Sequence, residues 1–226
     1  MTTVVAIDGP AASGKSTTAK LVAQRLGFVH LDTGAMYRAV TLACLEYQLP
    51  AQETPQMAEL LASLAIQFKS VGGEEQRTIL NGQDVTDRIR SPEVTGQVSR
   101  YSALAMIREH LADMQRKMGA ELNVVCEGRD IGTRVFPGAR FKFYLVADQE
   151  VRAKRRYDEL RSLGRKASLK RIARELQHRD LEDSTREHSP LRRADDALIV
   201  DTTNLTIREQ VDLIVARVEA GLRSGD

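Results

Sequence analysis

The feature that most constrains this chain is a glycine-rich loop near its N-terminus. Residues 9–17 read GPAASGKST, which contains the spacing G-x-x-x-x-G-K-[ST]. A short apolar run over residues 4–7 precedes the loop, and residues 18–26 carry apolar side chains at helical spacing before Gly27. A strand, a loop and a helix in this order are the context in which the pattern marks a phosphate-binding loop. The sequence therefore predicts a site for a nucleoside triphosphate.

Each residue type in this loop has a physical task. The glycines let the backbone turn so that successive N–H groups point at phosphate oxygens, at the positive end of a helix. Lys15 brings a mobile positive charge to the β and γ phosphates. The Ser16 hydroxyl can bind Mg²⁺ together with waters and phosphate oxygens. We assign binding of the triphosphate, which the resemblance described below implies to be ATP, to the whole loop, namely Gly9, Pro10, Ala11, Ala12, Ser13, Gly14, Lys15, Ser16 and Thr17.

Further apolar runs indicate the rest of the fold. Helical patterns separate them, as in a parallel sheet that is covered by helices on both faces. Together with the first run they predict the five-stranded α/β fold of the P-loop NTPases. The four runs are residues 28–31, 123–127, 141–146 and 197–201.

The middle of the chain follows a different pattern. Residues 67–88 contain short extended pieces, two of which flank Asn81-Gly82. Asn-Gly is the preferred pair for a tight type I′ hairpin turn. We therefore predict a small antiparallel insertion here, outside the main alternation, with helical texture returning over residues 92–118.

The charge of the chain is unevenly distributed. Residues 151–193 contain 14 Lys or Arg against 7 Asp or Glu, although the whole chain carries only +2. Such an excess indicates an anionic partner, either a nucleic acid or the phosphates of a small ligand. Aromatic residues make up 4% and there is no Trp, so a platform for stacking bases is poorly supplied. We therefore favour phosphates.

The remaining composition favours a cytoplasmic protein. No apolar stretch approaches the roughly 20 residues that span a bilayer, and the N-terminus has neither the basic flank nor the apolar core of a secretion signal. Cys44 and Cys126 are far apart and are expected to stay reduced. The four histidines, His30, His110, His178 and His188, form no ligand cluster, so no metal site is inferred from them.

Arginines after the predicted strands favour a small-molecule kinase over a switch or a motor. The N-K-x-D motif of switch GTPases is absent. Arg38 follows the second predicted strand and Arg129 the third, and Gly164 divides the basic segment. A kinase must hold two sets of phosphates and exclude water, which requires arginines from separate elements and a mobile lid.

Four motifs together resemble bacterial cytidylate kinase, a P-loop nucleoside monophosphate kinase. They are GPAASGKST, LDTGAMYR at residues 31–38, EGRDIGTRVFP at 127–137 and RDLEDSTRE at 179–187. The resemblance implies transfer of the γ-phosphoryl group of ATP to CMP or dCMP, forming CDP or dCDP and ADP, with Mg²⁺. It also implies a core of residues 1–50, 120–150 and 190–226, an NMP-binding insertion at 51–119 and a lid at 151–189, within a single domain.

The resemblance assigns the CMP site residue by residue. Tyr37, Arg38 and Arg129 would lie around the acceptor, with the two arginines facing its phosphate. Thr33, Arg108, Asp130 and Arg186 would address the cytosine, and Ser99, Arg179 and Asp183 the sugar, with Ser102 as an alternative to Ser99. The residues that would act in catalysis are Lys15, Arg38, Arg129 and the lid arginines Arg155 and Arg156, with Arg152 and Arg165 as neighbours.

Some assignments follow from position alone. Asp32 could aid Mg²⁺ through a water, but a structural role at a helix N-terminus is favoured. Residues 201–206 follow the fifth predicted strand and are a candidate adenine loop. We expect a monomer that binds ATP and CMP or dCMP, and neither nucleic acid nor membrane.

Overall fold

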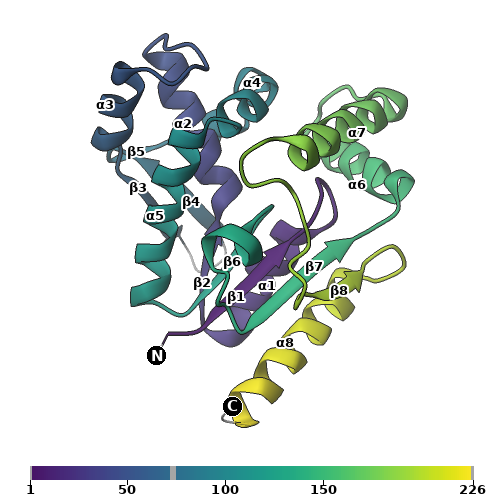
Figure 1. Ribbon diagram of the computed structural model, residues 1–226. Coiled ribbons are helices and arrows are strands. Elements are labelled where there is room, and N and C mark those ends of the chain that lie inside the picture. The colour runs from purple at the N-terminus through teal and green to yellow at the C-terminus, as the bar shows by residue number, and fades with distance from the viewer. Residues whose placement is uncertain (1, 72–74, 225–226) are drawn as a thin grey trace. The chain divides into compact units, whose positions relative to one another are not determined.

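The computed structural model describes residues 2–71 and 75–224. The chain divides into two compact units, one formed by residues 1–30 and 118–226 and the other by residues 31–117. The first unit is built on a five-stranded sheet with the order β2-β6-β1-β7-β8 (Figure 1). Its strands are β1 (Val4–Asp8), β2 (Val29–Asp32), β6 (Val124–Gly128), β7 (Phe141–Val146) and β8 (Leu198–Asp201).

The sheet is parallel, as the alternating pattern predicts. β1 lies at its centre, where Val5 pairs with Val125 of β6 on one side and with Phe141 of β7 on the other. Residues 5–7 of β1 are completely buried. A run without polar alternation is what a strand covered on both faces requires.

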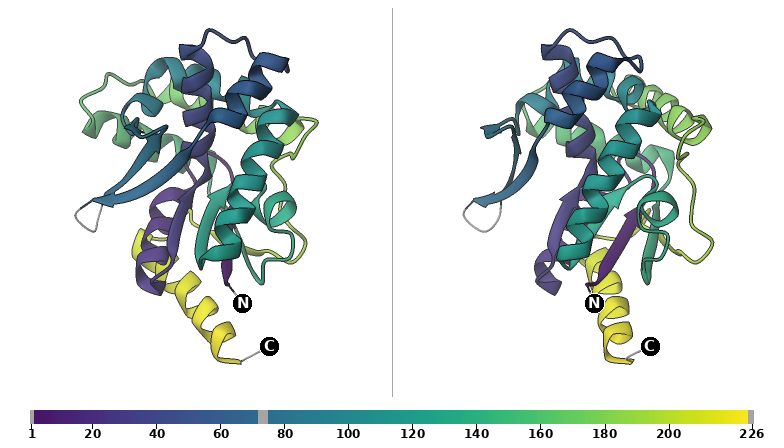
Figure 2. Two further views of the ribbon diagram at one scale, coloured as in Figure 1. Left: turned by 90° about the vertical axis from the view of Figure 1, so that its left-hand side faces the viewer. Right: turned by 60° about the vertical axis from the view of Figure 1, so that its left-hand side comes forward.

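Two helices of the first unit pack together beside the sheet. α1 (Lys15–Leu26) contacts α8 (Ile207–Ser224), and both contribute to a core with β1, β7 and β8 (Figure 2, left). α1 begins after Gly14, which has φ 95°, and ends at Gly27, which has φ 68°. Both conformations are left-handed, and glycine adopts them without the Cβ penalty.

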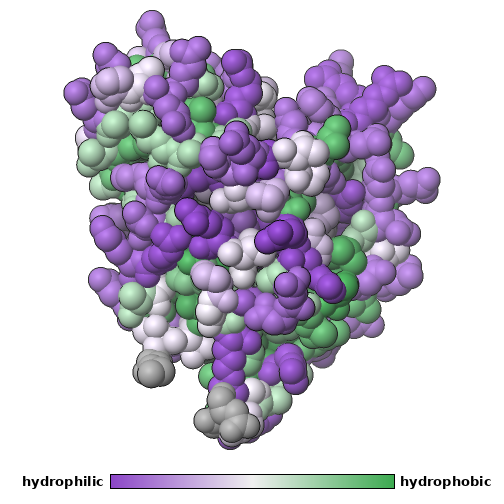
Figure 3. Space-filling view, in the orientation of Figure 1, coloured by the Kyte–Doolittle hydropathy of each residue, from purple (hydrophilic) through white to green (hydrophobic). Residues whose placement is uncertain are grey.

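The basic segment forms two helices with a short break. α6 (Gln149–Ser162) and α7 (Leu169–Thr185) pack on each other through Ala153, Ile172 and Leu176. The predicted break around Gly164 is confirmed. This pair presents mostly hydrophilic side chains (Figure 3), and several are paired with each other, such as Lys154 with Asp158.

The second unit contains the antiparallel insertion. β3 (Ile66–Val71), β4 (Glu75–Leu80) and β5 (Gln83–Asp84) form a separate sheet. The turn between β4 and β5 has positive φ at both Asn81 (48°) and Gly82 (83°), as a type I′ turn requires. The helical elements of this region are α2 (Thr33–Glu46), α3 (Pro55–Ser63), the 3₁₀ turn η1 (Arg88–Arg90), α4 (Pro92–Ser102) and α5 (Ala105–Glu121), which continues into the first unit.

Side-chain caps set where these helices begin. Asp32 accepts a hydrogen bond from the Ala35 N–H at the start of α2 (2.9 Å), so its structural role is present. Thr54 and Ser91 cap α3 and α4 in the same way, each followed by a proline in the first turn. Cys44 and Cys126 are buried, and neither forms a disulfide within the described residues. No helix in the described part of the chain is long and apolar enough to cross a membrane.

Candidate functional site

The loop between β1 and α1 depends on glycine at two places. Gly9 has φ 148°, and a Cβ built on it would lie 2.2 Å from the carbonyl oxygen of Leu145 in β7. Only glycine permits this approach of the loop to the neighbouring strand. Gly14 turns the chain into α1, whose N-terminus leaves backbone N–H groups without intrahelical partners. The loop therefore supplies the donors that an anion requires.

Lys15 is buried in this loop. Its Nζ donates to the carbonyl oxygen of Pro10 (2.6 Å) and lies 3.4 Å from the Ser13 hydroxyl. Burial, and then the positive charges of Arg129 and Arg179, hold the pKa of Lys15 well below its usual value. The lysine thus has cationic neighbours, and an anion placed among them would relieve the repulsion.

Ser16 is hydrogen-bonded to a buried carboxylate. Its Oγ donates to Oε2 of Glu127 at 2.7 Å, and Nε2 of His30 lies 3.1 Å from Oε1 of the same carboxylate. Burial alone would raise the pKa of Glu127, but His30, Lys15 and Ser16 together hold it below its usual value. Glu127 is therefore a charged acceptor beside the loop.

A magnesium ion fits this part of the site as a partner of the nucleotide. The described residues include no group of three or more His, Cys, Asp or Glu side chains that could hold a metal. Mg²⁺ in phosphate-transfer sites is usually held by one or two protein oxygens, several waters and the phosphates. The Ser16 oxygen is suited to this task because the Glu127 carboxylate already accepts its proton.

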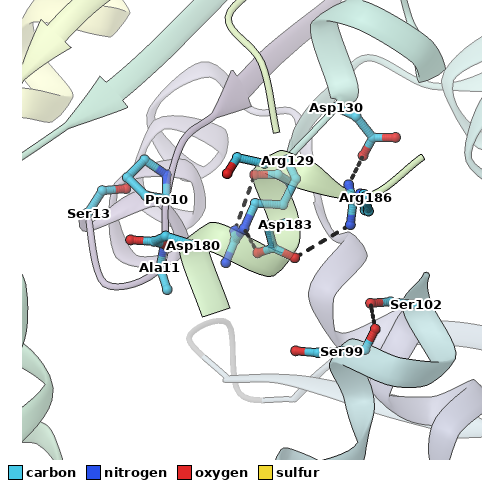
Figure 4. Close-up of polar contacts among 12 residues, drawn as sticks. Pro10, Ala11, Ser13, Ser99, Ser102, Arg129, Asp130, Asp180, Asp183 and Arg186 are labelled. Atoms are coloured by element: carbon cyan, nitrogen blue, oxygen red, sulfur yellow. Dashed lines mark hydrogen bonds and ion pairs between the residues drawn. The ribbon is translucent and has the colours of Figure 1, made fainter. Parts of the chain in front are cut away.

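A network of alternating charges lies at the turn after β6 (Figure 4). The Arg129 Nε donates to Asp183 of α7 at 2.8 Å. Arg186, the residue that follows α7, lies 3.5 Å from Asp183 and 3.9 Å from Asp130, measured between the charged atoms. Burial would raise the pKa of Asp183, but the arginines, Arg129 first, hold it below its usual value. The structure thus brings together four residues that the resemblance assigns to CMP.

Asp8 anchors the turn that carries Arg129 and Asp130. Its two carboxylate oxygens accept hydrogen bonds from the backbone N–H groups of Ile131 (2.9 Å) and Gly132 (2.8 Å). These begin a short π-helical turn, η2 (Ile131–Val135). Burial raises the pKa of Asp8 to about 6, against the two N–H groups, which lower it.

Two side chains connect the loop to α6 and α7. Arg152 donates to the carbonyl oxygen of Ala11 (3.0 Å) and forms an ion pair with Asp180. Asp180 in turn accepts a hydrogen bond from the Ala11 N–H (3.1 Å). Both backbone groups of one loop residue are therefore held by the helix pair.

The predicted lid arginines have partners in their own unit. Arg155 donates to the carbonyl oxygen (2.6 Å) and hydroxyl (3.0 Å) of Thr202, within the candidate adenine loop. Arg156 pairs with Glu159 at 2.7 Å. The Nε of Arg179 is buried and has no hydrogen-bond partner among the described residues. Burial, together with the charge of Arg129, lowers the pKa of Arg179 to about 10.

The second unit holds the other residues assigned to CMP. The Arg108 guanidinium lies over the Tyr37 ring, 5.2 Å from its centre, and donates to the Ser102 carbonyl oxygen at 2.9 Å. The Ser102 hydroxyl donates to the carbonyl oxygen of Ser99 (3.1 Å). The stack of a cation on an aromatic face keeps a charged group in a defined place.

Arg38 and Thr33 come from α2. Arg38 donates to the Ile89 carbonyl oxygen (3.1 Å) and to the Thr95 hydroxyl (2.9 Å), which fixes its guanidinium within this unit. Thr33 is buried in the first turn of the helix. The roles that the resemblance gives to these two residues stay predictions.

The profile of the cytidylate kinase family matches residues 5–220, nearly the entire chain. The chain belongs to the cytidylate kinase family. It is 45% identical over 223 residues to a cytidylate kinase of Citrifermentans bemidjiense, covering 99% of this chain and 95% of that protein. It is 48% identical over 207 residues to one of Carboxydothermus hydrogenoformans, covering 92% and 93%.

The fold of this family member is also seen in more distant solved structures. An uncharacterized protein from Eubacterium ventriosum superposes with a TM-score of 0.52 at 10% identity, covering 97% of this chain and 99% of that one. This similarity concerns the fold alone.

Two features of the site were not found from the sequence. Asp8 ends the first apolar run and His30 lies in the second, and neither belongs to a pattern that predicts a partner. The available signal for each was a polar residue inside or at the end of a buried strand, where an unpaired polar group is costly.

Proposed function

We propose that this protein transfers the γ-phosphoryl group of ATP to CMP or dCMP. The observation that carries the proposal is a group of three cations at the phosphate loop. Besides burial, the charges of Arg129 and Arg179 lower the pKa of Lys15, and the charge of Arg129 lowers the pKa of Arg179, so these cations repel one another. Such a concentration of buried positive charge suits the binding of phosphates. Membership of the cytidylate kinase family supports a nucleoside monophosphate as the second substrate beside ATP.

In the proposed reaction a phosphate oxygen of CMP forms a bond to the γ-phosphorus, and the bond from that phosphorus to the β–γ bridging oxygen breaks. The products are CDP and ADP. The CMP phosphate is already an anionic nucleophile, so no general base is needed. Catalysis then consists of alignment and electrostatic stabilisation by the loop N–H groups, Lys15 and the arginines. Bound Mg²⁺, held by Ser16, waters and phosphates, would neutralise charge on the phosphates.

The charge network after β6 supports the choice of cytosine. Cytosine offers an amino donor beside two acceptors, so Asp130 can accept from the amino group while Arg186 donates. Uracil presents a carbonyl oxygen in place of the amino group, so two acceptors would face each other at the Asp130 carboxylate. Asp183 and Arg179 are proposed to hold the sugar.

The contacts of Thr33, Tyr37, Arg38, Ser99 and Arg108 with CMP are part of the same proposal, as are Arg155 and Arg156 as lid arginines. So are a monomeric state, the division into core, insertion and lid, and residues 201–206 as the adenine loop. The two reduced cysteines support a cytoplasmic location.

Steady-state assays with ATP and a panel of acceptors test the proposal. We expect turnover of CMP and dCMP, and at least tenfold lower kcat/KM for UMP, AMP and shikimate. Failure to phosphorylate either cytidine nucleotide would overturn the assignment. A steep salt-dependent affinity for nucleic acid in its place would favour a nucleic-acid-binding role for the basic segment.

Two substitutions test the base-reading pair. Asp130→Ala and Arg186→Ala should each reduce kcat/KM for CMP by about 100-fold and remove the preference over UMP, since a lost charged hydrogen bond costs about 1.5–3 kcal/mol. ATP affinity should change little. Asp195→Ala, which removes an exposed aspartate, is the matched control. If both variants keep their selectivity, the base is read elsewhere.

A further inference from the structure

The Glu127 carboxylate, which accepts a hydrogen bond from Ser16, also contacts His30. This histidine lies in β2, and its side chain is 11% exposed while that of Glu127 is 4% exposed. Ser16 and His30 contact different oxygens of the carboxylate, Oε2 and Oε1. The carboxylate is therefore held from both ends.

The direction of the Ser16 hydrogen bond determines what the hydroxyl can still do. A serine hydroxyl has one proton to donate and two lone pairs that accept or bind a cation. The proton of Ser16 is used by Glu127. Both lone pairs then point away from the carboxylate, which leaves the oxygen as a ligand of defined direction.

A glutamate side chain has three rotatable bonds, so the position of its carboxylate requires a second contact. The neighbouring backbone supplies part of the explanation for His30, because β2 and β6 are adjacent in the sheet and the Val29 N–H donates to the Asn123 carbonyl oxygen at 2.9 Å. Because these strands are neighbours, the side chain of His30 on β2 can meet that of Glu127 on β6.

We propose that His30 is a positioning residue for the metal–nucleotide complex, acting through Glu127 on the Ser16 hydroxyl. The inference rests on the proposed function insofar as Ser16 binds Mg²⁺ with ATP, but it does not depend on which nucleotide accepts the phosphoryl group. In this role His30 would bind neither the metal nor the phosphates directly. It fixes the carboxylate rotamer, and the carboxylate fixes the direction in which the serine oxygen faces.

The test measures ATP binding by titration calorimetry, with and without Mg²⁺, on the whole protein and without any acceptor. In His30→Phe the ring remains and the contact to Glu127 is lost. Outer partners of metal ligands typically contribute 10–100-fold to metal affinity. We expect this variant to lose about tenfold of the Mg²⁺-dependent gain in ATP affinity and to bind metal-free ATP as the wild type does.

Conservative substitution separates positioning from packing. The amide nitrogen of Gln reaches about as far as the Nε2 of His, so His30→Gln should keep the gain within about threefold of wild type. His30→Asn is too short for this contact and should behave like His30→Phe, and it tests the same point if the phenylalanine variant does not fold. His178→Phe, at an exposed histidine of α7, is the matched control.

A double-mutant cycle tests the route through Glu127. Residues that act as one unit are not additive, so His30→Phe should have no further effect on Mg²⁺-dependent binding once Glu127→Gln is present. Independent, multiplying effects of the two changes would overturn the proposal. So would equal losses of metal-free and metal-dependent binding, which indicate a structural role only. Failure of the proposed function is distinct, since it leaves ATP binding intact and removes CMP turnover.

Discussion

Substitution of Asp8 tests how much free energy of unfolding the protein loses by burying the carboxylate that anchors the Arg129–Asp130 turn. The carboxylate is buried and charged near neutral pH only at a cost, because burial raises its pKa from 3.8 to about 6. It nevertheless accepts two backbone N–H groups of the turn that carries Arg129 and Asp130. Asp8→Asn removes the charge and keeps the shape.

The magnitude follows from linkage. A shift of about two pKa units corresponds to roughly 3 kcal/mol of unfavourable free energy when the carboxylate is charged in the folded state. Because the folded pKa is the higher one, the wild type is stabilised by this group below about pH 4 and loses that contribution as pH rises through 6. Asparagine has a single acceptor oxygen, so one N–H loses its partner at a cost of about 1–3 kcal/mol. At pH 8 the free energy that Asp8→Asn gains by removing the buried charge is therefore nearly offset by the free energy that it loses at the unpaired N–H group.

The assay is urea unfolding of both proteins between pH 5 and pH 8. The free energy of unfolding of the wild type should improve relative to Asp8→Asn by about 1.4 kcal/mol as pH falls from 8 to 5, the proton-uptake range of a group with folded pKa near 6. Comparison of the two proteins cancels the other titrating groups that they share.

Parallel stability curves for the two proteins across this range would refute the reasoning, since they would mean that Asp8 takes up no proton on folding. Asp195→Asn, at an exposed aspartate, is the control and should give a curve parallel to that of the wild type. We also expect kcat for CMP to fall at least tenfold in Asp8→Asn, because half of the anchor for the Arg129–Asp130 turn is lost.

Two further substitutions test the loop and the charge network. Gly9→Ala should abolish measurable ATP binding and destabilise the protein by about 3 kcal/mol or more, because its Cβ would collide with the Leu145 carbonyl group and the backbone conformation disfavours a side chain; ATP titration and urea unfolding measure this. Asp183→Asn should cost about 3 kcal/mol at pH 7 by breaking a buried ion pair with Arg129. The loss should shrink as pH falls below 3.8, because the unfolded wild-type carboxylate takes up a proton there while the folded one, whose pKa is lower, is still charged; urea unfolding against pH measures this.

Matched controls exist for both. Gly82 also has a positive φ, but a Cβ there would meet nothing within 4 Å, so an equal effect of Gly82→Ala would contradict the collision argument. Asp212 pairs with Arg25 at the surface, where both side chains are about half exposed. Asp212→Asn should cost less than about 1 kcal/mol, and a larger cost than that of Asp183→Asn would contradict the role of burial.

The parts of the fold that could be predicted from sequence are those determined locally. The phosphate loop is a contiguous pattern between a strand and a helix, and Asn81-Gly82 alone specifies a turn with two positive φ angles. The charge network after β6 could be predicted only through the resemblance, since Arg129 and Asp183 are 54 residues apart.

The partners of Asp8 and His30 could not be predicted in this way. His30 meets Glu127 because β2 and β6 are neighbours, and the strand order does not follow from the alternation of strands and helices. Asp8 meets the N–H groups of a π-helical turn that no periodicity in residues 131–135 indicates. In both cases the sequence showed a polar residue in a buried strand without showing what satisfies it.

At Ala11 a carboxylate of the protein itself occupies a backbone donor of the phosphate loop and would compete with a bound phosphate for it. The Ala11 N–H, one of the donors that a phosphate could use, is hydrogen-bonded to the carboxylate of Asp180 in α7. An anion that takes this donor has to displace a carboxylate that already carries the same charge. The affinity of the loop for nucleotide therefore includes the free energy of exchanging one anion for another, and α7, more than 150 residues further along the chain, contributes to setting it.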